Sequence, residues 1–549
     1  MIESFKMKKK QLNVKKTDLN KLAEWAVLGL LLVYVGIFVY FNLTQYLNQV
    51  DSDMAAEALL AKEMWTTKSV IPSTWFTSTE RRILSTSLLG ALFYGITNNM
   101  AVSIGLSCSV FMGIIIAGYF YLAKQLPLSG LAKYTGLLLI FAFPANCILA
   151  EGESLPYFTY LFFLYAGYYA PMGAFMFFTM GYYFKQIKSK EWKKSFWIVG
   201  AVLAVTSFVL GCSGMRTVEM VLLPLLLADL VRLYKKTERF TKMPSRMESA
   251  PTVTVIALLA VNMMGMLMPF SVEYVSKFVT PEEIVSGLIG TVLPSLLEIL
   301  GIAGGSELKS AGGLMQLLIY VMLAAVVYSC VMIFREKEKW EEKKEILLFY
   351  LFSVLLTAFI LSVTMIGASA NYFHSAIFLV AFAVAFLIDW FQDNSVFLKY
   401  ALISFIILFA VFNLKYTYAN ALKQDQEKNR DYAEAAEWLL ENGYEYGYAE
   451  FWDANKLTMF TNGQVTVAPV TDIVSITPYR WLTSSNNYPF TLPPQMKTAY
   501  IMRREKRESF EEAMDAHPGL VQSFKNDRFV IFTGDLNYAI IFPEEGEDE

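Results

Sequence analysis

Two aspartates, Asp51 and Asp53, follow the first long apolar segment of the chain and are the residues best suited to chemistry. A carboxylate at a membrane surface can act as a general base that takes a proton from a hydroxyl or amine acceptor. Two carboxylates at this spacing can also share a divalent cation that bridges them to a phosphate group. The structural interpretation is an N-cap, because Asp is favoured at the N-cap and in the first turn of a helix. The two interpretations are compatible, since one carboxylate can cap a helix and accept a proton.

The segment that must position these aspartates is predicted to be an amphipathic helix over residues 54–65, which suits the plane of a membrane surface. Its apolar residues are Met54, Leu59, Leu60 and Met64, and its polar residues are Glu57, Lys62 and Glu63. A turn containing Pro72 follows, then the charged cluster of residues 80–82 and a short apolar block at 83–97.

The composition of the whole chain indicates an integral membrane protein. Of its 549 residues, 55% are hydrophobic and only 17% are charged, whereas soluble proteins average about 25% charged residues. A bilayer core of about 30 Å is crossed by about 20 consecutive apolar residues. We predict an α-helical polytopic fold with about eleven spanning helices. The predicted spans are residues 22–44, 99–123, 131–149, 157–184, 195–211, 216–234, 252–270, 312–334, 345–366, 373–390 and 398–416.

Loop charge orients the chain, because Lys and Arg concentrate on the cytoplasmic side of membrane proteins. If the short block 83–97 does not cross, the basic N-terminus and the basic loops at 185–194, 232–246 and 335–344 all lie on one side. We therefore predict that block 83–97 is a re-entrant or interfacial helix on the outer face. The chain is expected to be a multi-pass protein of the cell membrane with a cytoplasmic N-terminus.

This orientation predicts the domain organisation. Residues 1–21 form the basic cytoplasmic N-terminus, and residues 22–417 form a transmembrane domain. Residues 44–98 of that domain are the first external loop, which carries juxtamembrane helices. Residues 418–549 are expected to form a small extracytoplasmic α/β domain, because one helical pattern and several short apolar runs alternate there. Loop residues in this domain resemble a carbohydrate-recognition set: Trp452, Asp453, Asn455, Arg480, Trp481 and Tyr488.

Other polar residues on the predicted outer face are candidates for substrate binding. Glu151 and Glu153 are either part of a solvated loop or a second acidic site that faces Asp51 and holds a metal or orients the acceptor. Arg216 lies at the mouth of a helix, where an ionisable residue is costly and is by default a functional candidate. It either pairs with Glu219 along the helix or binds a phosphate through its planar guanidinium group.

Two further residues complete the predicted binding set. Tyr157 begins an aromatic run, residues 157–178, which suits an isoprenoid chain or simply the membrane interface. His374 begins a late helix and is either an interfacial residue or a donor to a phosphate or sugar. The chain has only two histidines and its four cysteines lack ligand spacing, so no metal cluster is predicted. No cofactor is expected, apart from the divalent cation left open at the two aspartates.

The order of elements near the N-terminus resembles that of GT-C glycosyltransferases. A membrane helix, the Asp51-x-Asp53 pair, a predicted surface helix, a Pro-containing turn and an apolar block follow one another. The resemblance is to the branch of protein O-mannosyltransferases and the lipid A aminoarabinose transferase. It covers about the first 125 residues in detail, and the topology covers the whole chain. Two segments depart from the family pattern, Ser-Thr-Glu-Arg-Arg at 78–82 and Asn-Tyr-Phe-His at 371–374.

The resemblance implies an inverting glycosyltransferase of GT-C type that uses a sugar on a polyprenyl phosphate. The acceptor is expected to be an envelope glycan, lipid or protein on the outer face of the membrane. The family pattern implies that Asp51 is the catalytic base, with Asp53 as the alternative. A transporter or flippase of lipid-linked saccharides, or a catalytically degenerate scaffold, remains as an alternative function. Nucleotide-binding fingerprints and basic-aromatic surfaces are missing from the sequence, so nucleic acid is not an expected partner.

Overall fold

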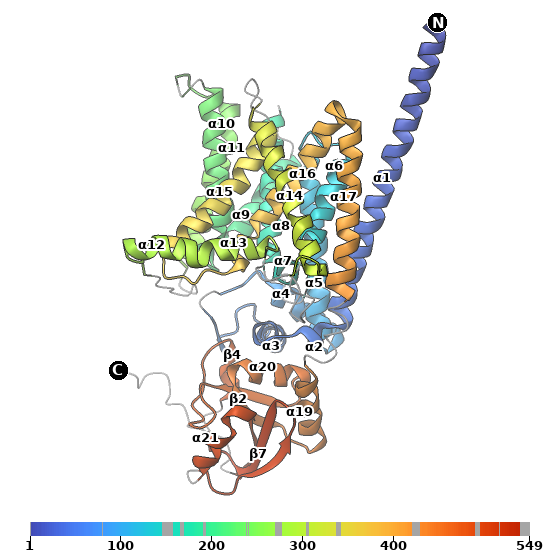
Figure 1. Ribbon diagram of the computed structural model, residues 1–549. Helices are drawn as coiled ribbons and strands as arrows, with labels where there is room; N and C mark the ends of the chain where they lie inside the picture. The colour runs from blue at the N-terminus through green and yellow to red at the C-terminus, as the bar shows by residue number, and fades with distance from the viewer. Residues whose placement is uncertain are drawn as a thin grey trace. The chain divides into compact units, whose positions relative to one another are not determined.

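The computed structural model describes most of the chain. The described residues are 2–78, 81–144, 157–164, 169–189, 194–237, 239, 241–268, 277–302, 307–335, 342–419, 429–488, 495–514 and 517–538. They form two compact units (Figure 1). The first, called here the helical unit, comprises Met1–Phe38, Met112–Phe162 and Ala170–Ala421. The second, called here the mixed unit, comprises Val39–Phe111, Phe163–Tyr169 and Leu422–Glu549.

The helical unit is built from long apolar helices joined by short connections. Its α-helices are the first part of α1 (Ile2–Thr44), the last part of α5 (Met100–Ala123), α6 (Gly130–Ala142), α7 (Tyr157–Phe162), α8 (Ala170–Lys188), α9 (Lys194–Gly211), α10 (Leu223–Lys236), α11 (Arg246–Met266), α12 (Pro281–Gly287), α13 (Leu293–Ile299), α14 (Ala311–Arg335), α15 (Glu342–Val363), α16 (Ser375–Asn394) and α17 (Val396–Asn413). Short π or 3₁₀ segments lie at η2 (Val218–Leu222), η3 (Leu288–Val292), η4 (Ala370–Phe373) and η5 (Leu414–Tyr418). Helices α12 and α13 run crosswise to the long helices of this unit (Figure 1).

The predicted polytopic helical class is confirmed. Seven helices among the described residues are long and apolar enough to cross a membrane. They are Leu19–Thr44, Met100–Ala123, Glu248–Met266, Ala311–Arg335, Glu342–Val363, Ala370–Asn394 and Val396–Tyr418. The apolar stretch of the span that contains α16 is 83% buried, against 28–50% for the other six. The span that contains α16 is therefore the most buried of these seven.

One basic residue counted as loop charge turns out to be buried. Arg232 is 2% exposed near the end of α10, where its Nη2 atom lies 2.6 Å from Oδ1 of Asp229. Its Nε atom lies 3.6 Å from Oε1 of Glu345 on α15. A buried charge needs such partners, since desolvation is costly without them. This arginine therefore links two helices and does not contribute to the charge of the loop that follows.

The mixed unit begins with the segment predicted as the first external loop. It contains α2 (Tyr46–Gln49), α3 (Ser52–Thr67), β1 (Trp75–Phe76), α4 (Thr86–Thr97) and the first part of α5. Helix α4 has 12 residues, which extend about 18 Å at 1.5 Å per residue and fall short of a bilayer core of about 30 Å. That block 83–97 does not cross stays a prediction.

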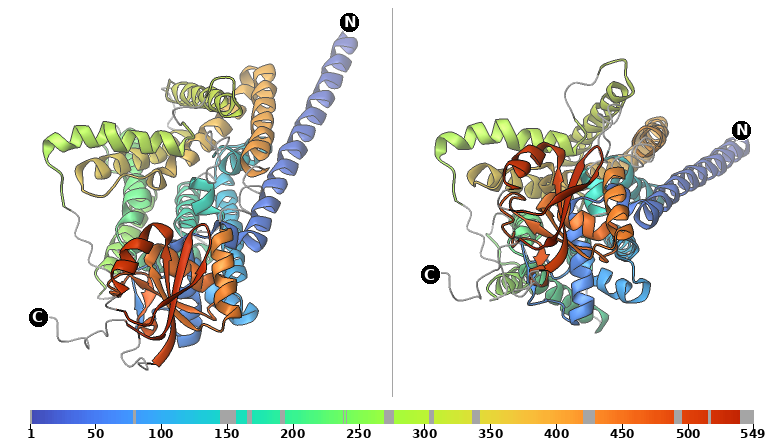
Figure 2. Two further views of the ribbon diagram at one scale, coloured as in Figure 1. Left: turned by 60° about the horizontal axis from the view of Figure 1, so that its bottom comes forward. Right: turned by 90° about the horizontal axis from the view of Figure 1, so that it is seen from below.

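The C-terminal part of the mixed unit is a small α/β structure, as predicted. It contains α19 (Arg430–Glu441), β2 (Tyr446–Glu450), α20 (Phe451–Phe460), β3 (Thr466–Val470), β4 (Thr483–Ser484), η6 (Ser485–Asn487), β5 (Gln495–Arg503), η7 (Arg504–Lys506), α21 (Arg507–Glu512), β6 (Val521–Lys525) and β7 (Phe529–Leu536). Five strands form a mixed sheet in the order β3-β2-β5-β7-β6. Strand β2 is parallel to β3 and β5, and β7 is antiparallel to β5 and β6. Figure 2 shows this sheet from two further directions, in orange and red.

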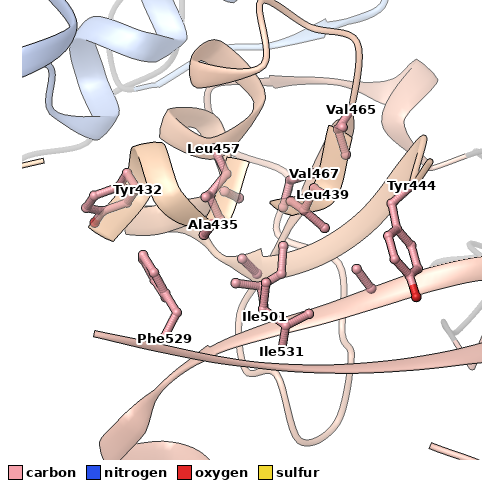
Figure 3. Close-up of a cluster of buried hydrophobic side chains, with 13 residues drawn as sticks. Tyr432, Ala435, Leu439, Tyr444, Leu457, Val465, Val467, Ile501, Phe529 and Ile531 are labelled. Carbon is pink, nitrogen blue, oxygen red and sulfur yellow. The ribbon is translucent and has the colours of Figure 1, made fainter. Parts of the chain in front are cut away.

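Alternating side chains of the central strands supply a hydrophobic core on each face of this sheet. On one face, Ala499 and Ile501 of β5 pack with residues of α19 and α20, such as Leu439 and Leu457 (Figure 3). On the other face, Tyr500 and Met502 pack with Phe510 and their neighbours. The short apolar run at residues 499–502 is the signal that predicted this strand.

The first-loop segment and the C-terminal segment are joined by strand pairing. Strands β1 and β4 form a two-stranded antiparallel sheet in which Trp75 pairs with Ser484 and Phe76 with Thr483. Helix α3 also packs against α20. The two segments therefore fold into one compact unit although they are about 400 residues apart in the sequence.

Candidate functional site

Asp51 is the N-cap of helix α3. Its backbone is extended, with φ −103° and ψ −178°, and its Oδ1 atom accepts a 2.8 Å hydrogen bond from the backbone N–H of Met54. The Asp51 side chain is exposed. This arrangement satisfies one of the orphan N–H groups at the start of the helix. The structure therefore confirms the prediction that Asp51 is an N-cap residue.

Asp53 lies in the first turn of α3, is partly buried and lines a cavity of about 610 Å³. Burial raises the pKa of its carboxyl group to about 6, and the neighbouring charges of Asp51 and Glu57 act in the same direction. The positive charge of Arg82 opposes them. A carboxylate with a pKa near the working pH combines the ionised form with a useful proton affinity, which is the requirement for a general base.

Glu57 lies one turn beyond Asp53 and is only 6% exposed. Its Oε1 atom is 3.4 Å from Nη1 of Arg82, and its other carboxylate oxygen accepts a hydrogen bond from the hydroxyl of Ser87. These partners compensate for the burial of the charge. Sequence reasoning placed Glu57 on the polar face of a surface helix and missed this pair, because nothing local marks Arg82 or Ser87 as its partners.

The predicted helix at residues 54–65 exists, and its polar side chains contact other parts of the mixed unit: Glu57 is buried, and Lys62 and Glu63 are partly buried. Lys62 donates to the carbonyl oxygen of Gly463 at 3.2 Å, and burial lowers the pKa of its amine. Glu63 accepts hydrogen bonds from Thr74 at 2.5 Å and from Ser484 at 3.1 Å. Helix α3 packs against both α4 and α20, which explains these contacts. Its predicted place along the membrane surface stays a prediction.

The wall of the cavity opposite to the first-loop residues comes from the sheet. Glu450 ends β2, and Val470 ends the parallel neighbour β3 in register with it. Carboxyl ends of adjacent parallel strands are a common place for ligand sites in α/β folds. The cavity is lined by Asp53, Ser78, Arg82, Glu450, Phe451, Trp452, Val470, Thr471, Tyr479, Trp481 and Leu482. Residues from both ends of the mixed unit therefore share one cavity.

The predicted carbohydrate-recognition set divides into two groups. Trp452 and Trp481 line the cavity, and Trp452 is 61% exposed. Arg480 is also exposed, and its guanidinium lies 5.9 Å from the ring centre of Phe76. These residues are available to a ligand in the cavity or at its rim.

The other three residues are structural, so their predicted role in binding was wrong. Asp453 is 2% exposed and lies 2.7 Å from Nε of Arg503 and 3.1 Å from Nη2 of Arg528. Asn455 donates to the carbonyl oxygen of Leu482 at 3.2 Å. The hydroxyl of Tyr488 donates to the carbonyl oxygen of Pro469 at 2.5 Å. Each side chain points into the fold because the helix and loops that carry it bury that face.

The predicted donor-binding residues lie in the helical unit. The guanidinium carbon of Arg216 lies 4.9 Å from the ring centre of Tyr372, a distance typical of a cation–π contact. His374, two residues further on, is 1% exposed, and its Nδ1 atom is 3.3 Å from the carbonyl oxygen of Asn371. The structure therefore brings Arg216 to the segment 371–374 that carries His374.

The side chains of the remaining predicted site residues lie outside the described part of the structure. Tyr157 is the first residue of α7, and its side chain lies outside the described part of the structure. Glu151 and Glu153 lie outside the described residues. Asp51 and Asp53 belong to the mixed unit, whereas Arg216, His374 and Tyr157 belong to the helical unit.

The described residues hold no group of three or more His, Cys, Asp or Glu side chains placed to bind an ion. The alternative that a divalent cation bridges Asp51 and Asp53 to a phosphate stays a prediction.

The fold has the GT-C-like form that the order of elements near the N-terminus predicted, as its likeness to a solved structure shows. It is similar to ArnT from Cupriavidus metallidurans bound to undecaprenyl phosphate, with a TM-score of 0.54, 10% sequence identity, and coverage of 92% of this chain and 97% of that chain. The apo state of the same protein gives the same values. The oligosaccharyltransferase of Archaeoglobus fulgidus in its apo form matches with a TM-score of 0.44 at 11% identity, over 90% of this chain and 68% of that chain. No protein-family model and no curated protein sequence matches this chain.

Proposed function

We propose that the protein is an integral membrane glycosyltransferase of inverting type. It moves a sugar from a polyprenyl-phosphate donor to a cell-envelope acceptor on the outer face of the cytoplasmic membrane. The observation that carries this proposal is Asp53, a carboxylate with a pKa of about 6 that follows the first apolar helix and lines a cavity of about 610 Å³. The GT-C fold supports it, and a protein of similar fold, ArnT, was solved with undecaprenyl phosphate bound.

The reaction needs a base for the acceptor, and we assign this role to Asp53. With a pKa of about 6, its carboxyl group is about ten times more often ionised than protonated at pH 7. The carboxylate accepts the proton of an acceptor hydroxyl as that oxygen forms a bond to the anomeric carbon of the donor sugar. The bond from that carbon to the phosphate oxygen breaks, and its electron pair leaves with the polyprenyl phosphate. Attack from the side opposite to the phosphate inverts the anomeric centre.

Asp51 has a different part in this proposal. Its Oδ1 atom caps α3, and the cap fixes the first turn of the helix in which Asp53 lies. A capping residue contributes about 1 kcal/mol to a helix, and Asn caps about as well as Asp. We therefore treat Asp51 as a positioning residue and Asp53 as the base.

The leaving phosphate gains negative charge as the bond breaks, and a fixed cation stabilises such charge. We assign this role to Arg216, whose planar guanidinium can donate two parallel hydrogen bonds to phosphate oxygens. Tyr372 supports it, since its ring lies 4.9 Å from the guanidinium carbon and limits the orientations of the side chain. The roles of His374, Tyr157, Glu151 and Glu153 in substrate binding remain part of the proposal.

The direct test is turnover of a polyprenyl-phosphate sugar by the purified chain in nanodiscs. Release of undecaprenyl phosphate should require both the protein and an envelope extract that supplies the acceptor. Mass spectrometry of envelope glycans from a deletion strain should show the loss of one sugar. Movement of an intact lipid-linked saccharide across the bilayer, without release of undecaprenyl phosphate, would instead establish a flippase.

A further inference from the structure

The wall of the 610 Å³ cavity contributed by the C-terminal segment is unusually rich in aromatic side chains. Phe451 is buried, and its ring centre lies 5.2 Å from that of Trp452 and 5.5 Å from that of Tyr479. Both contacts are close to perpendicular, with interplanar angles of 70° and 68°. Edge-to-face contacts of this kind are favourable and orient the rings. Phe451 therefore orients Trp452 and Tyr479, and all three residues line the cavity.

Exposure of apolar ring surface to water is unfavourable, and a ligand bound in the cavity would cover that surface. Trp452 remains 61% exposed although it lies at the start of a packed helix, and burial of apolar surface is worth about 25 cal/mol per Å². The face of an aromatic ring carries partial negative charge. The C–H face of a sugar ring is apolar with slightly positive hydrogens, so it matches the face of an indole ring in shape and charge.

The charges around the cavity favour an uncharged ligand. Its lining contains two carboxylates, Asp53 and Glu450, and Arg82 is the one cation among the described residues that line it. Arg82 already lies 3.4 Å from the carboxylate of Glu57. Burial raises the pKa of Glu450, with Lys506 at 3.8 Å acting against this effect. A phosphorylated or acidic ligand would place like charges together, which is unfavourable.

Carboxylates and hydroxyls are well suited to a polyhydroxylated ligand. A carboxylate accepts hydrogen bonds from sugar hydroxyls, and the side chains of Ser78 and Thr471 can donate or accept. The volume of about 610 Å³ lies within the range of roughly 300–1,000 Å³ typical of small-ligand sites. The cavity thus combines an aromatic wall with a few polar groups, which is the usual composition of such a site.

We propose that this cavity binds the acceptor and that the acceptor is an uncharged saccharide. Its sugar ring stacks on Trp452 and Trp481, and one hydroxyl points to Asp53. This inference rests on the proposed function, because it identifies the acceptor for the same carboxylate. It assigns the choice of acceptor to residues that follow strands β2 and β3.

Binding of saccharides to the full chain in nanodiscs, with no donor present, tests this inference. The probes are neutral trisaccharides of mannose, glucose, galactose and N-acetylglucosamine, each paired with a phosphorylated or carboxylated counterpart. We expect at least one neutral probe to bind and its charged counterpart to bind at least tenfold more weakly. Trp452→Ala and Trp481→Ala should each weaken binding of the neutral probe at least tenfold, and Trp452→Phe should retain most of it.

Trp197→Ala is the matched control, because Trp197 is 59% exposed in the helical unit and does not line the cavity. This variant should bind the probe as the wild type does. Thermal unfolding of each variant separates loss of the fold from loss of the site, and Trp452→Phe provides a second check. Tighter binding of a charged probe, binding of no neutral probe, or unchanged binding by both alanine variants would overturn the inference.

Release of undecaprenyl phosphate, measured on the same samples, keeps this inference separate from the proposed function. Normal release together with unchanged saccharide binding in the tryptophan variants would refute the acceptor site alone. Absence of release from every polyprenyl-phosphate sugar, under conditions where the wild type binds saccharide, would refute the transferase.

Discussion

The hydroxyl of Ser52 donates a 2.7 Å hydrogen bond to the carbonyl oxygen of Phe451, a residue 399 positions away in the sequence. Both groups are buried. The residues that follow them, Asp53 and Trp452, line the same cavity. One hydrogen bond between the starts of α3 and α20 therefore sets a carboxylate beside an aromatic wall.

The first prediction concerns the pH dependence of transfer. The negative charge of Glu57 raises the pKa of Asp53, so Glu57→Gln should lower it. If ionised Asp53 is the base, the acid limb of the pH profile of kcat/KM should then move to lower pH. Glu63→Gln is the control, because Glu63 lies on the same helix and bonds to Thr74. If the acid limb moves equally in both variants, or in neither, the activity does not depend on the ionisation of Asp53.

The second prediction concerns the stability of the protein. A pKa raised from 3.8 to about 6 means that ionised Asp53 destabilises the folded state above pH 6, and that the penalty disappears below pH 4. The full change corresponds to about 3 kcal/mol, an upper bound for a group that is only partly buried. Asp53→Asn should therefore raise the Tm at pH 7.5, and the gain should shrink as the pH falls from 6 to 4. A gain of equal size at pH 4 would point to a cause other than ionisation.

The third prediction concerns Asn429, which fixes the backbone just before Asp51. Its side-chain amide donates to the carbonyl oxygens of Leu47 at 2.9 Å, Asn48 at 3.0 Å and Val50 at 3.3 Å. Its oxygen accepts from Nζ of Lys456 at 2.9 Å. Asn429→Ala should cost about 1–3 kcal/mol, because buried polar groups lose their partners.

Two measurements separate this positioning role from a purely structural one. Asn429→Ala should lower kcat more than it raises KM for the donor, since it shifts the start of α3. Asn442→Ala is the control, because Asn442 is exposed and its side-chain amide donates to the carbonyl oxygen of Trp438 in its own helix. Equal losses of kcat in the two variants would show that Asn429 does not position the start of α3 for catalysis.

The fourth prediction concerns Arg216. Arg216→Lys keeps the positive charge and loses the planar pair of donors, so donor affinity should fall. Arg216→Ala should lower it further, by at least about tenfold, since a hydrogen bond to a charged group is worth roughly 1.5–3 kcal/mol. Glu219→Gln should leave donor affinity nearly unchanged. Equal affinity of Arg216→Ala and the wild type for the donor in nanodiscs would exclude Arg216 from the phosphate site.

The sequence was a good guide to elements that depend on local pattern. Apolar blocks of bilayer length predicted most long helices of the helical unit, and the short apolar run at 499–502 predicted a strand. The single span predicted at 157–184 was wrong, because the structure has two helices there, α7 and α8. Helices α12 and α13 were not predicted. Asp at position 51 predicted the N-cap of α3, which the structure contains.

The cavity could not be predicted in the same way, because its residues come from segments about 400 positions apart. Trp452 and Asp453 illustrate the difficulty. They are adjacent, yet Trp452 is 61% exposed and Asp453 only 2%. Successive residues of a helix point about 100° apart, so one reaches the cavity while the other reaches Arg503 and Arg528. Which face is buried depends on the sheet beneath α20, and no local signal carries that information.

Glu57 was misplaced for the same reason. Its position on a predicted polar face implied water, but α4 and Arg82 cover it in the folded chain. A polar residue on a helix can face solvent or a buried partner, and only the tertiary structure distinguishes the two.

The measurement that tests the central claim most directly compares Asp53→Asn with Asp51→Asn. Both substitutions keep the size of the side chain, and Asn still caps a helix at position 51. Release of undecaprenyl phosphate with saturating acceptor should fall at least about 100-fold in Asp53→Asn, as expected for loss of a general base. Asp51→Asn should retain most of its activity. Full activity in Asp53→Asn, or a loss confined to Asp51→Asn, would contradict the assignment of Asp53 as the catalytic base.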